Sequence, residues 1–122
     1  VEVIPFGWQT TKALIEETLV SLDVLNRETT LRMNGDKPLV TDEANYIVDL
    51  HLKRIANPRQ LAMVLNQIPG VVENGLFIDI CDIVILGHPD GRVVLRDINS
   101  GETEDSRVDF APADNIFADL GD

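Results

Sequence analysis

The apolar positions of the chain follow a helical period most clearly between Asn57 and Gly70. Residues spaced i, i+3, i+4 and i+7 form one apolar stripe, and they are Leu61, Val64, Leu65 and Ile68. Asn57 can cap the first turn, and Pro58 suits the first helical position because its missing N–H would have had no partner there. Pro69-Gly70 ends the pattern, and Val71-Val72 opens a strand directly after it. The pattern predicts a short helix joined to a strand by almost no loop.

A period of two runs from Asn45 to Lys53 and predicts a strand. The side chains on one face are apolar, and they are Tyr46, Val48, Leu50 and Leu52. Most of those on the opposite face are polar. This alternation is typical of an antiparallel sheet that helices cover on one side.

The remaining elements complete an alternating order. We expect a strand at Val1–Ile4, a helix at Ala13–Asp23 capped by Thr10 or Thr11, a strand at Thr29–Met33, an extended segment at Pro38–Thr41 and a strand at Val71–Ile78. Up to Ile78 the order is β-α-β-β-α-β. The sequence therefore predicts the α+β class and a ferredoxin-like split arrangement.

The segment after Ile78 has a different pattern. Ile83–Gly87 is a continuous apolar run, which is typical of a strand buried on both faces. His88–Gly91 predicts a turn, and Val93–Leu95 returns as the partner of a hairpin. Ser100–Arg107 is polar and acidic and predicts a flexible linker. Ala113–Leu120 predicts a short helix, which could dock on its own domain or be captured by a partner.

Composition and charge narrow the functional classes. With 44% hydrophobic and 25% charged residues, the 122-residue chain has the composition of a soluble globular domain. A net charge of −11 disfavours binding to nucleic acids and to anionic membranes. Eight of the 21 acidic residues, but one of the 10 basic residues, lie from Asp97 onward.

Cysteine usage and targeting signals suggest a compartment. Cys81 is the single cysteine, which excludes an intrachain disulfide, favours the cytoplasm and indicates a small core residue. No apolar run approaches the ~20 residues that span a bilayer. No secretory signal is visible, and a chain that begins at Val1 is expected to be processed, proteolysed or truncated.

Four stretches in collinear order resemble the C-terminal half of type A ribose-5-phosphate isomerase, covering the chain to about Arg96. They are Val1–Gly7, Leu39–Asp42 with Asn45–Asp49, Ile68–Phe77, and Ile83–Gly87 followed by Pro89–Gly91. The resemblance implies a ferredoxin-like small (lid) domain over residues 1–79. It also implies a returning β-hairpin over 80–98 that belongs to a larger, Rossmann-like domain, and it leaves 99–122 as an acidic C-terminal extension.

The resemblance also implies partners. The larger domain comes from residues upstream of this chain, so we expect the edge of Ile83–Gly87 to be covered by a second chain or fragment, or by the tail. In the resembled family the lid caps the active-site cleft and supplies contacts in a homodimer or homotetramer. The catalytic half would be supplied in cis or as a separate chain.

The implied activity interconverts ribose 5-phosphate and ribulose 5-phosphate through an enediolate, without a metal or organic cofactor. The family's motifs for this chemistry are Gly-Thr-Gly-Ser-Thr, Asp-Gly-Ala-Asp-Glu and Lys-Gly-Gly-Gly-Ala followed by Glu. None occurs here, and no two glycines are adjacent. We therefore assign no catalytic, cofactor-binding or metal-binding residue to the chain, and we expect it to be inactive alone.

Several other polar residues have two interpretations. Asp49 and His51 share a strand face near Asp42 and Glu43, which suits either a metal site or a solvated face with an ion pair. Asp42 also fits an Asx-type turn to Asn45.

Three further positions are expected to be structural. His88 and Asp90-Gly91 belong to a turn, and Gly75 marks a bulge or a close backbone approach within its strand. Phe6 and Trp8 are either core residues or oligomer contacts.

A second functional hypothesis remains open. The chain could be a free-standing ferredoxin-like module that binds a small molecule or a partner without catalysis.

Overall fold

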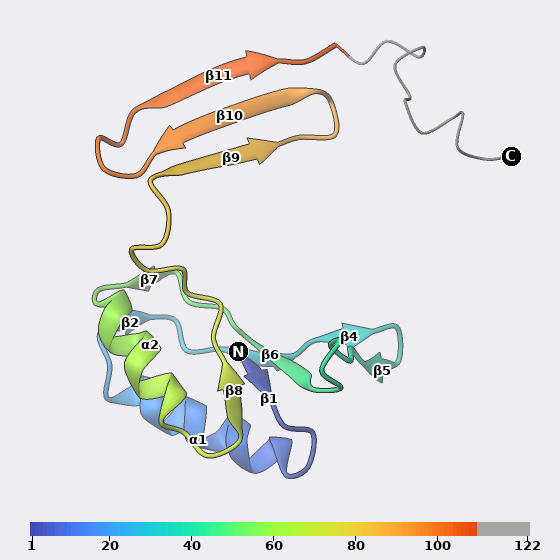
Figure 1. Ribbon diagram of the computed structural model, residues 1–122. Helices are drawn as coiled ribbons and strands as arrows, with labels where there is room; N and C mark the ends of the chain where they lie inside the picture. Colours follow the sequence, from blue (N-terminus) through green and yellow to red (C-terminus); the bar gives the residue numbers. More distant parts are fainter. Residues whose placement is uncertain (110–122) are drawn as a thin grey trace, which may run out of the picture. The chain divides into compact units, whose positions relative to one another are not determined.

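The structure is a computed structural model that describes residues 1–109, and its contacts divide the chain into two compact units, 1–78 and the residues from Asp79 onward (Figure 1). Elements of the first unit are β1 (Glu2–Val3), α1 (Trp8–Val20), β2 (Val24–Leu25), β3 (Thr29–Leu31), β4 (Met33–Asn34), β5 (Lys37–Pro38), β6 (Tyr46–Leu50), β7 (Arg54–Ile55), α2 (Pro58–Asn66) and β8 (Val71–Glu73). The helix expected at Ala113–Leu120 lies outside the described residues.

The main sheet of the first unit has four antiparallel strands in the order β3-β6-β1-β8. The first strand in the sequence therefore lies inside the sheet, between β6 and β8. Two further antiparallel pairs, β2–β7 and β4–β5, form separate two-stranded sheets. The mixed α and β content agrees with the predicted class.

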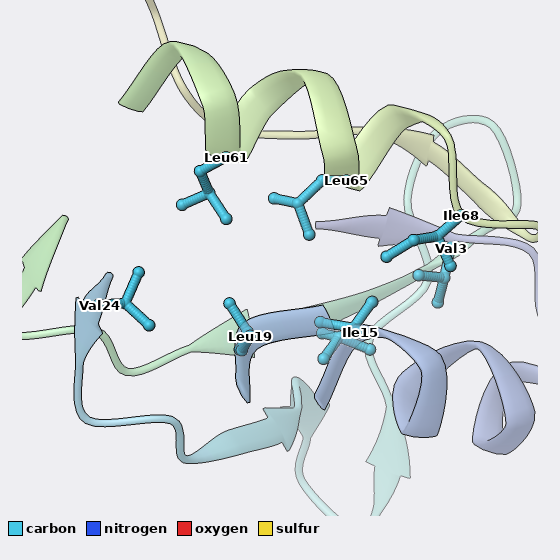
Figure 2. Close-up of a cluster of buried hydrophobic side chains, with 8 residues drawn as sticks. Val3, Ile15, Leu19, Val24, Leu61, Leu65 and Ile68 are labelled. Carbon is cyan, nitrogen blue, oxygen red and sulfur yellow. The ribbon is translucent and has the colours of Figure 1, made fainter. Parts of the chain in front are cut away.

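The two helices pack together against one face of this sheet, and eight side chains form the core (Figure 2). They are Val3, Ile15, Leu19, Val24, Val48, Leu61, Leu65 and Ile68. Figure 2 shows Leu61 and Leu65 of α2 pointing toward Leu19 and Ile15 of α1. The inward face predicted for β6 is confirmed, because Val48 is fully buried while Tyr46 and Leu50 pack at the core margin.

Helix α2 agrees with its prediction at the cap, at the exit and over most of the stripe, although it ends at Asn66 and Val64 is only half-buried. The Asn57 side chain accepts a hydrogen bond from the Gln60 backbone N–H at 3.0 Å, and Pro58 occupies the first turn. The apolar stripe is buried at Leu61, Leu65 and Ile68. The exit through Gly70 has a φ of +91°, which is the left-handed conformation expected there.

Helix α1 begins earlier than predicted. It runs from Trp8, not Ala13, and its N-cap is Gly7 with a φ of +69° and no side-chain cap. The expectation that Thr10 or Thr11 caps the helix is wrong, because Thr11 belongs to the buried face with Ile15 and Leu19 at a spacing of four.

Strand β8 ends earlier than predicted, at Glu73 instead of Ile78. The Asn74 side chain accepts a hydrogen bond from the Leu76 N–H at 3.0 Å and donates to Asn66 Oδ1 at 2.9 Å, so it replaces the ladder with a local turn. The assignment of Gly75 to a bulge or close approach is wrong, since Gly75 follows the strand and nothing lies within 4 Å of its Cβ position. The register instead shifts between Glu2 and Val3.

The second unit is a three-stranded antiparallel sheet in the order β11-β10-β9. Its strands are β9 (Ile83–Gly87), β10 (Arg92–Asp97) and β11 (Thr103–Arg107). The predicted hairpin turn is confirmed, because Gly91 N–H donates to the His88 carbonyl at 3.0 Å.

The expectation of a flexible linker at Ser100–Arg107 is wrong, since five of its residues form β11. Residues 103–107 pair in register with residues 92–96 of β10. Backbone hydrogen bonds drive this pairing, so a strand can form here from polar side chains that have no apolar face to bury.

We predict that Leu65→Ala lowers the free energy of unfolding of the first unit by about 2–5 kcal/mol, because Leu65 is 2% exposed and its truncation leaves a cavity. Met63→Ala on the same helix is the control: Met63 is 58% exposed, and its change should stay within about 0.5 kcal/mol. Urea unfolding followed by the fluorescence of Trp8, which packs at the core margin, measures both. Equal losses in the two variants would contradict the assigned core.

We also predict that Gly70→Ala is more destabilising than Gly35→Ala. Both glycines have positive φ, which costs an alanine about 1 kcal/mol. A Cβ at Gly70 would also clash with Thr11 Oγ1, whereas a Cβ at Gly35 has nothing within 4 Å. Thr11→Ala should relieve part of the excess cost in a double-mutant cycle measured by urea unfolding. Additive effects of the two substitutions would count against a clash.

Candidate functional site

The most unusual surface of the chain is strand β9. Ile83, Ile85 and Leu86 are 52%, 65% and 52% exposed. Successive side chains of a strand point to opposite faces, so Ile83 and Ile85 lie on one face of this sheet and Val84 and Leu86 on the other. Both faces of β9 are therefore apolar, as expected from the sequence, but within the described residues only Val84 is half-buried and the other apolar side chains are exposed.

Strand β9 is also paired along only one of its two edges within the described residues. Its one neighbouring strand among residues 1–109 is β10, where Leu95 faces Ile85 and Val94 faces Leu86. The other edge of β9 has no strand partner within the described chain. An apolar edge strand of this kind is a template for another strand, and its two apolar faces resemble those of a strand inside a covered sheet.

The first unit contains a cavity of about 280 Å³. Leucines of the core and its margin line it, together with Asp49 of β6 and with Arg32, which lies between β3 and β4. Arg32 holds Asp49 at both oxygens, with Nε to Oδ2 at 3.0 Å and Nη2 to Oδ1 at 2.5 Å. Because the guanidinium is already paired with a carboxylate, it is not an uncommitted cation for a phosphate.

The Arg32 pair sets the protonation of Asp49. Hydrogen bonds from Arg32 are the main cause that lowers the pKa of Asp49, and the positive charge acts in the same direction. Partial burial opposes the shift without reversing it. The chemistry of this pair is that of an ion pair, which is one of the two interpretations drawn from the sequence.

The residues considered for a metal site do not converge. His51 Nε2 lies 2.7 Å from the Thr30 hydroxyl, and Asp49 is held by Arg32. In the described part of the chain, no group of three or more His, Cys, Asp or Glu side chains could hold a metal ion.

The turn between Thr41 and Asn45 is built differently from the predicted Asx-type turn. The Thr41 hydroxyl, not the Asp42 carboxylate, accepts the Asn45 N–H at 3.1 Å. The same hydroxyl donates to Glu2 Oε1 at 2.8 Å, which ties the turn to β1. Ala44 has a φ of +61° in this turn.

The structure also shows how exposed Cys81, Phe6 and Trp8 are. Cys81 is exposed, so its expected place in the core is wrong within the described chain, because it precedes the β9 ladder and packs against no core. Phe6 is 95% exposed, whereas Trp8 packs at the core margin. Phe6 therefore keeps the interpretation of an oligomer contact, and Trp8 that of a core residue.

Sequence reasoning missed one polar link in the first unit. Glu16 accepts hydrogen bonds from Lys12 and from the Thr29 hydroxyl, both at 2.5 Å, and these bonds lower the pKa of Glu16. The i, i+4 spacing of Lys12 and Glu16 was the available signal, but the contact with β3 depends on the tertiary fold.

Comparison with known proteins gives consistent relatives. The sequence model of the family "Ribose 5-phosphate isomerase A (phosphoriboisomerase A)" matches residues 1–91. Ribose-5-phosphate isomerase A of Ruegeria pomeroyi is 72% identical over 122 residues, and that of Cereibacter sphaeroides is 70% identical. Both matches cover 100% of this chain and 47% of the relative, so the chain spans about half the length of the curated relatives it matches.

Solved structures agree. A D-ribose-5-phosphate isomerase in complex with phospho-erythronic acid is 37% identical with a TM-score of 0.57, and the match covers 88% of this chain and 40% of that one. The ribose 5-phosphate isomerase of Plasmodium falciparum has a TM-score of 0.60 at 20% identity. The match covers 90% of this chain and 42% of the Plasmodium chain, and at this identity it supports the fold alone. In the described residues, no helix is long and apolar enough to cross a membrane.

We predict that Asp49→Asn flattens the acid side of the stability profile. The pKa of Asp49 is lowered in the folded state, so the unfolded state takes up a proton first as the pH falls, and the stability from the ion pair is lost below the ordinary aspartate pKa. The loss of unfolding free energy between pH 7 and pH 3, measured by urea unfolding, should therefore be smaller in the variant.

Asp36→Asn, which changes an exposed aspartate in the β4–β5 turn, is the matched control for that measurement. It removes the same charge and should keep the pH dependence of the unsubstituted chain. An Asp49→Asn profile as steep as that of the control would contradict the assigned role of the ion pair.

Proposed function

Because the chain belongs to the ribose 5-phosphate isomerase A family, we propose that it is the C-terminal part of an enzyme that interconverts ribose 5-phosphate and ribulose 5-phosphate. The isomerisation needs a base that moves a proton between two carbons, donors for the developing oxyanion and amides that hold the phosphate. The chain lacks the three motifs that supply these groups in the family. Its role is therefore to support a site whose reacting groups lie elsewhere in the enzyme.

Strand β9 is the observation that carries this proposal. Ile85 is 65% exposed in a strand that is apolar on both faces, and such a strand is stable in water only when a sheet edge and covering elements are added to it. We propose that β9 and β10 join the sheet of the larger, Rossmann-like domain of the enzyme. The upstream catalytic half, in the same polypeptide or as a separate chain, is the partner.

The first unit is proposed as the ferredoxin-like lid. Its strand order β3-β6-β1-β8, with both helices against one face, supports the split β-α-β-β-α-β arrangement. The segmentation into 1–79, 80–98 and 99–122 is proposed on the same grounds. A lid of this kind caps the cleft without contributing the base.

We also propose that copies of the whole enzyme associate into a homodimer or homotetramer. A homodimer or homotetramer needs a surface that is apolar in the isolated subunit, and the 95% exposed side chain of Phe6 is a candidate contact. The cytoplasm is the proposed compartment because the substrate class is a metabolic sugar phosphate and the single thiol of Cys81 is free.

A non-catalytic binding module is the second candidate function. The cavity of about 280 Å³ beside Arg32 and Asp49 favours it, since a small ligand could enter there. Saturable binding of a small molecule to residues 1–78, retained when the upstream half is supplied, would support this alternative.

We predict that the 122-residue chain alone shows no turnover of ribose 5-phosphate above background, and that a polypeptide extended upstream to the length of the relatives does. A coupled assay with equal molar amounts of the two proteins measures this. Turnover by the chain alone at the rate of an intact isomerase would contradict the division of roles.

We further predict that Ile85→Lys in the extended polypeptide lowers the free energy of unfolding by about 2 kcal/mol or more and lowers the yield of active enzyme, because a lysine would be buried in the completed sheet. Met63→Lys is the matched control: Met63 is similarly exposed, at 58%, but lies on α2. Its change should stay within about 0.5 kcal/mol. Equal behaviour of the two variants would show that β9 is not covered.

A further inference from the structure

The three-stranded sheet of the second unit has two edges of opposite character. At one edge, β9 consists of Ile83–Gly87 and carries apolar side chains on both faces. At the other edge, β11 consists of Thr103–Arg107, contains no apolar residue and is exposed throughout. Between them, Val93, Val94 and Leu95 of β10 are half-buried. The share of apolar side chains thus decreases from β9 through β10 to β11.

Strand β11 is fixed to β10 along its whole length. Five residue pairs are in register, from Arg92 opposite Arg107 to Arg96 opposite Thr103. Across the two strands, the Arg92 guanidinium donates to both oxygens of Asp105, with contacts between 2.6 and 3.0 Å. A hydrogen bond to a carboxylate, made bidentately, holds geometry better than a single neutral one.

Backbone hydrogen bonds also hold the residues at both ends of β11. At its start, the Asp97 N–H donates to the Glu102 carbonyl at 3.0 Å. At its end, the Val108 N–H donates to the Gly91 carbonyl at 2.8 Å. Arg107 Nη2 reaches the Asp90 carbonyl at 3.2 Å, which attaches β11 to the β9–β10 turn as well. The strand is therefore a defined part of the sheet.

We propose that β11 is an edge cover: it occupies the backbone edge of β10 and prevents a second copy of this chain from adding a strand there. Without it, Val93–Leu95 would present an apolar edge with high β propensity, which favours strand addition between copies. This role does not depend on the isomerase activity, and it applies to a segment beyond residue 91, where the family match ends.

The side chains of β11 suit this role. Glu104 and Asp105 are exposed on adjacent positions, so they point to opposite faces of the sheet. Two copies that met through their β11 edges would bring these carboxylates together, and like charges on neighbouring strands are destabilising. The outer edge therefore resists pairing, and strand addition is confined to β9.

The test disrupts the β10–β11 ladder in one variant and makes the same change of charge without disrupting the ladder in a second variant. Adjacent residues of a strand direct their N–H groups to opposite sides, so Glu104→Pro with Asp105→Pro removes one donor to β10 whichever side each faces. Glu104→Gln with Asp105→Asn removes the same two charges and keeps every N–H. Light scattering over a concentration series measures the mass of the unsubstituted chain and of both variants.

The proline variant is expected to show about a two-fold or larger increase in average mass. The Gln/Asn variant loses the charges of Glu104 and Asp105 but keeps the β10–β11 ladder, so its increase should be clearly smaller. All three proteins keep the same β9 edge, so the difference reports on β10. An unchanged mass of the proline variant, or an equal increase in the Gln/Asn variant, would overturn the proposal.

Amide hydrogen exchange gives a second readout of the same samples. At low concentration the amides of Val93–Leu95 should lose protection in the proline variant, and they should regain it where the mass increases. The unfolding transition of the first unit, followed through Trp8, should be unchanged in all three proteins. Protection retained by Val93–Leu95 in the dilute proline variant would also overturn the proposal.

Discussion

The packing of two helices on one face of a four-stranded antiparallel sheet determines the first unit. Val3 and Val48 on the inner strands meet Ile15 and Leu19 of α1, and Leu65 of α2 closes the cluster. These five side chains are fully or almost fully buried. The Arg32–Asp49 ion pair lies outside this core.

Sequence alone predicted the elements whose signals lie within the element. Helix α2 has its cap at Asn57, its stripe and its exit at Gly70 in one short segment, and each was found in the structure. The start of α1 could not be read in this way, because Gly7 begins the helix through its backbone conformation while Thr11 is buried by tertiary contact. Strand β11 was missed because apolar patterning does not register a strand held by backbone pairing.

Part of the candidate site could also be predicted, because the signal for β9 lies within its own five residues. The two apolar faces of Ile83–Gly87 follow from composition, and the structure shows them exposed within this chain. The Arg32–Asp49 pair follows from neither composition nor spacing, since the two residues are 17 positions apart and meet through strand pairing. The absence of the three family motifs, in contrast, can be seen in the sequence itself.

The close approach of Gly70 to Thr11 has a consequence for how this family can vary. The Thr11 hydroxyl donates to the Pro69 carbonyl at 3.3 Å, and the space for a Cβ at position 70 is already filled by that side chain. Thr11 and Gly70, which are distant in the sequence, therefore share one small volume. A side chain at position 70 would need a residue smaller than threonine at position 11, so the tolerance of position 70 depends on the residue at position 11.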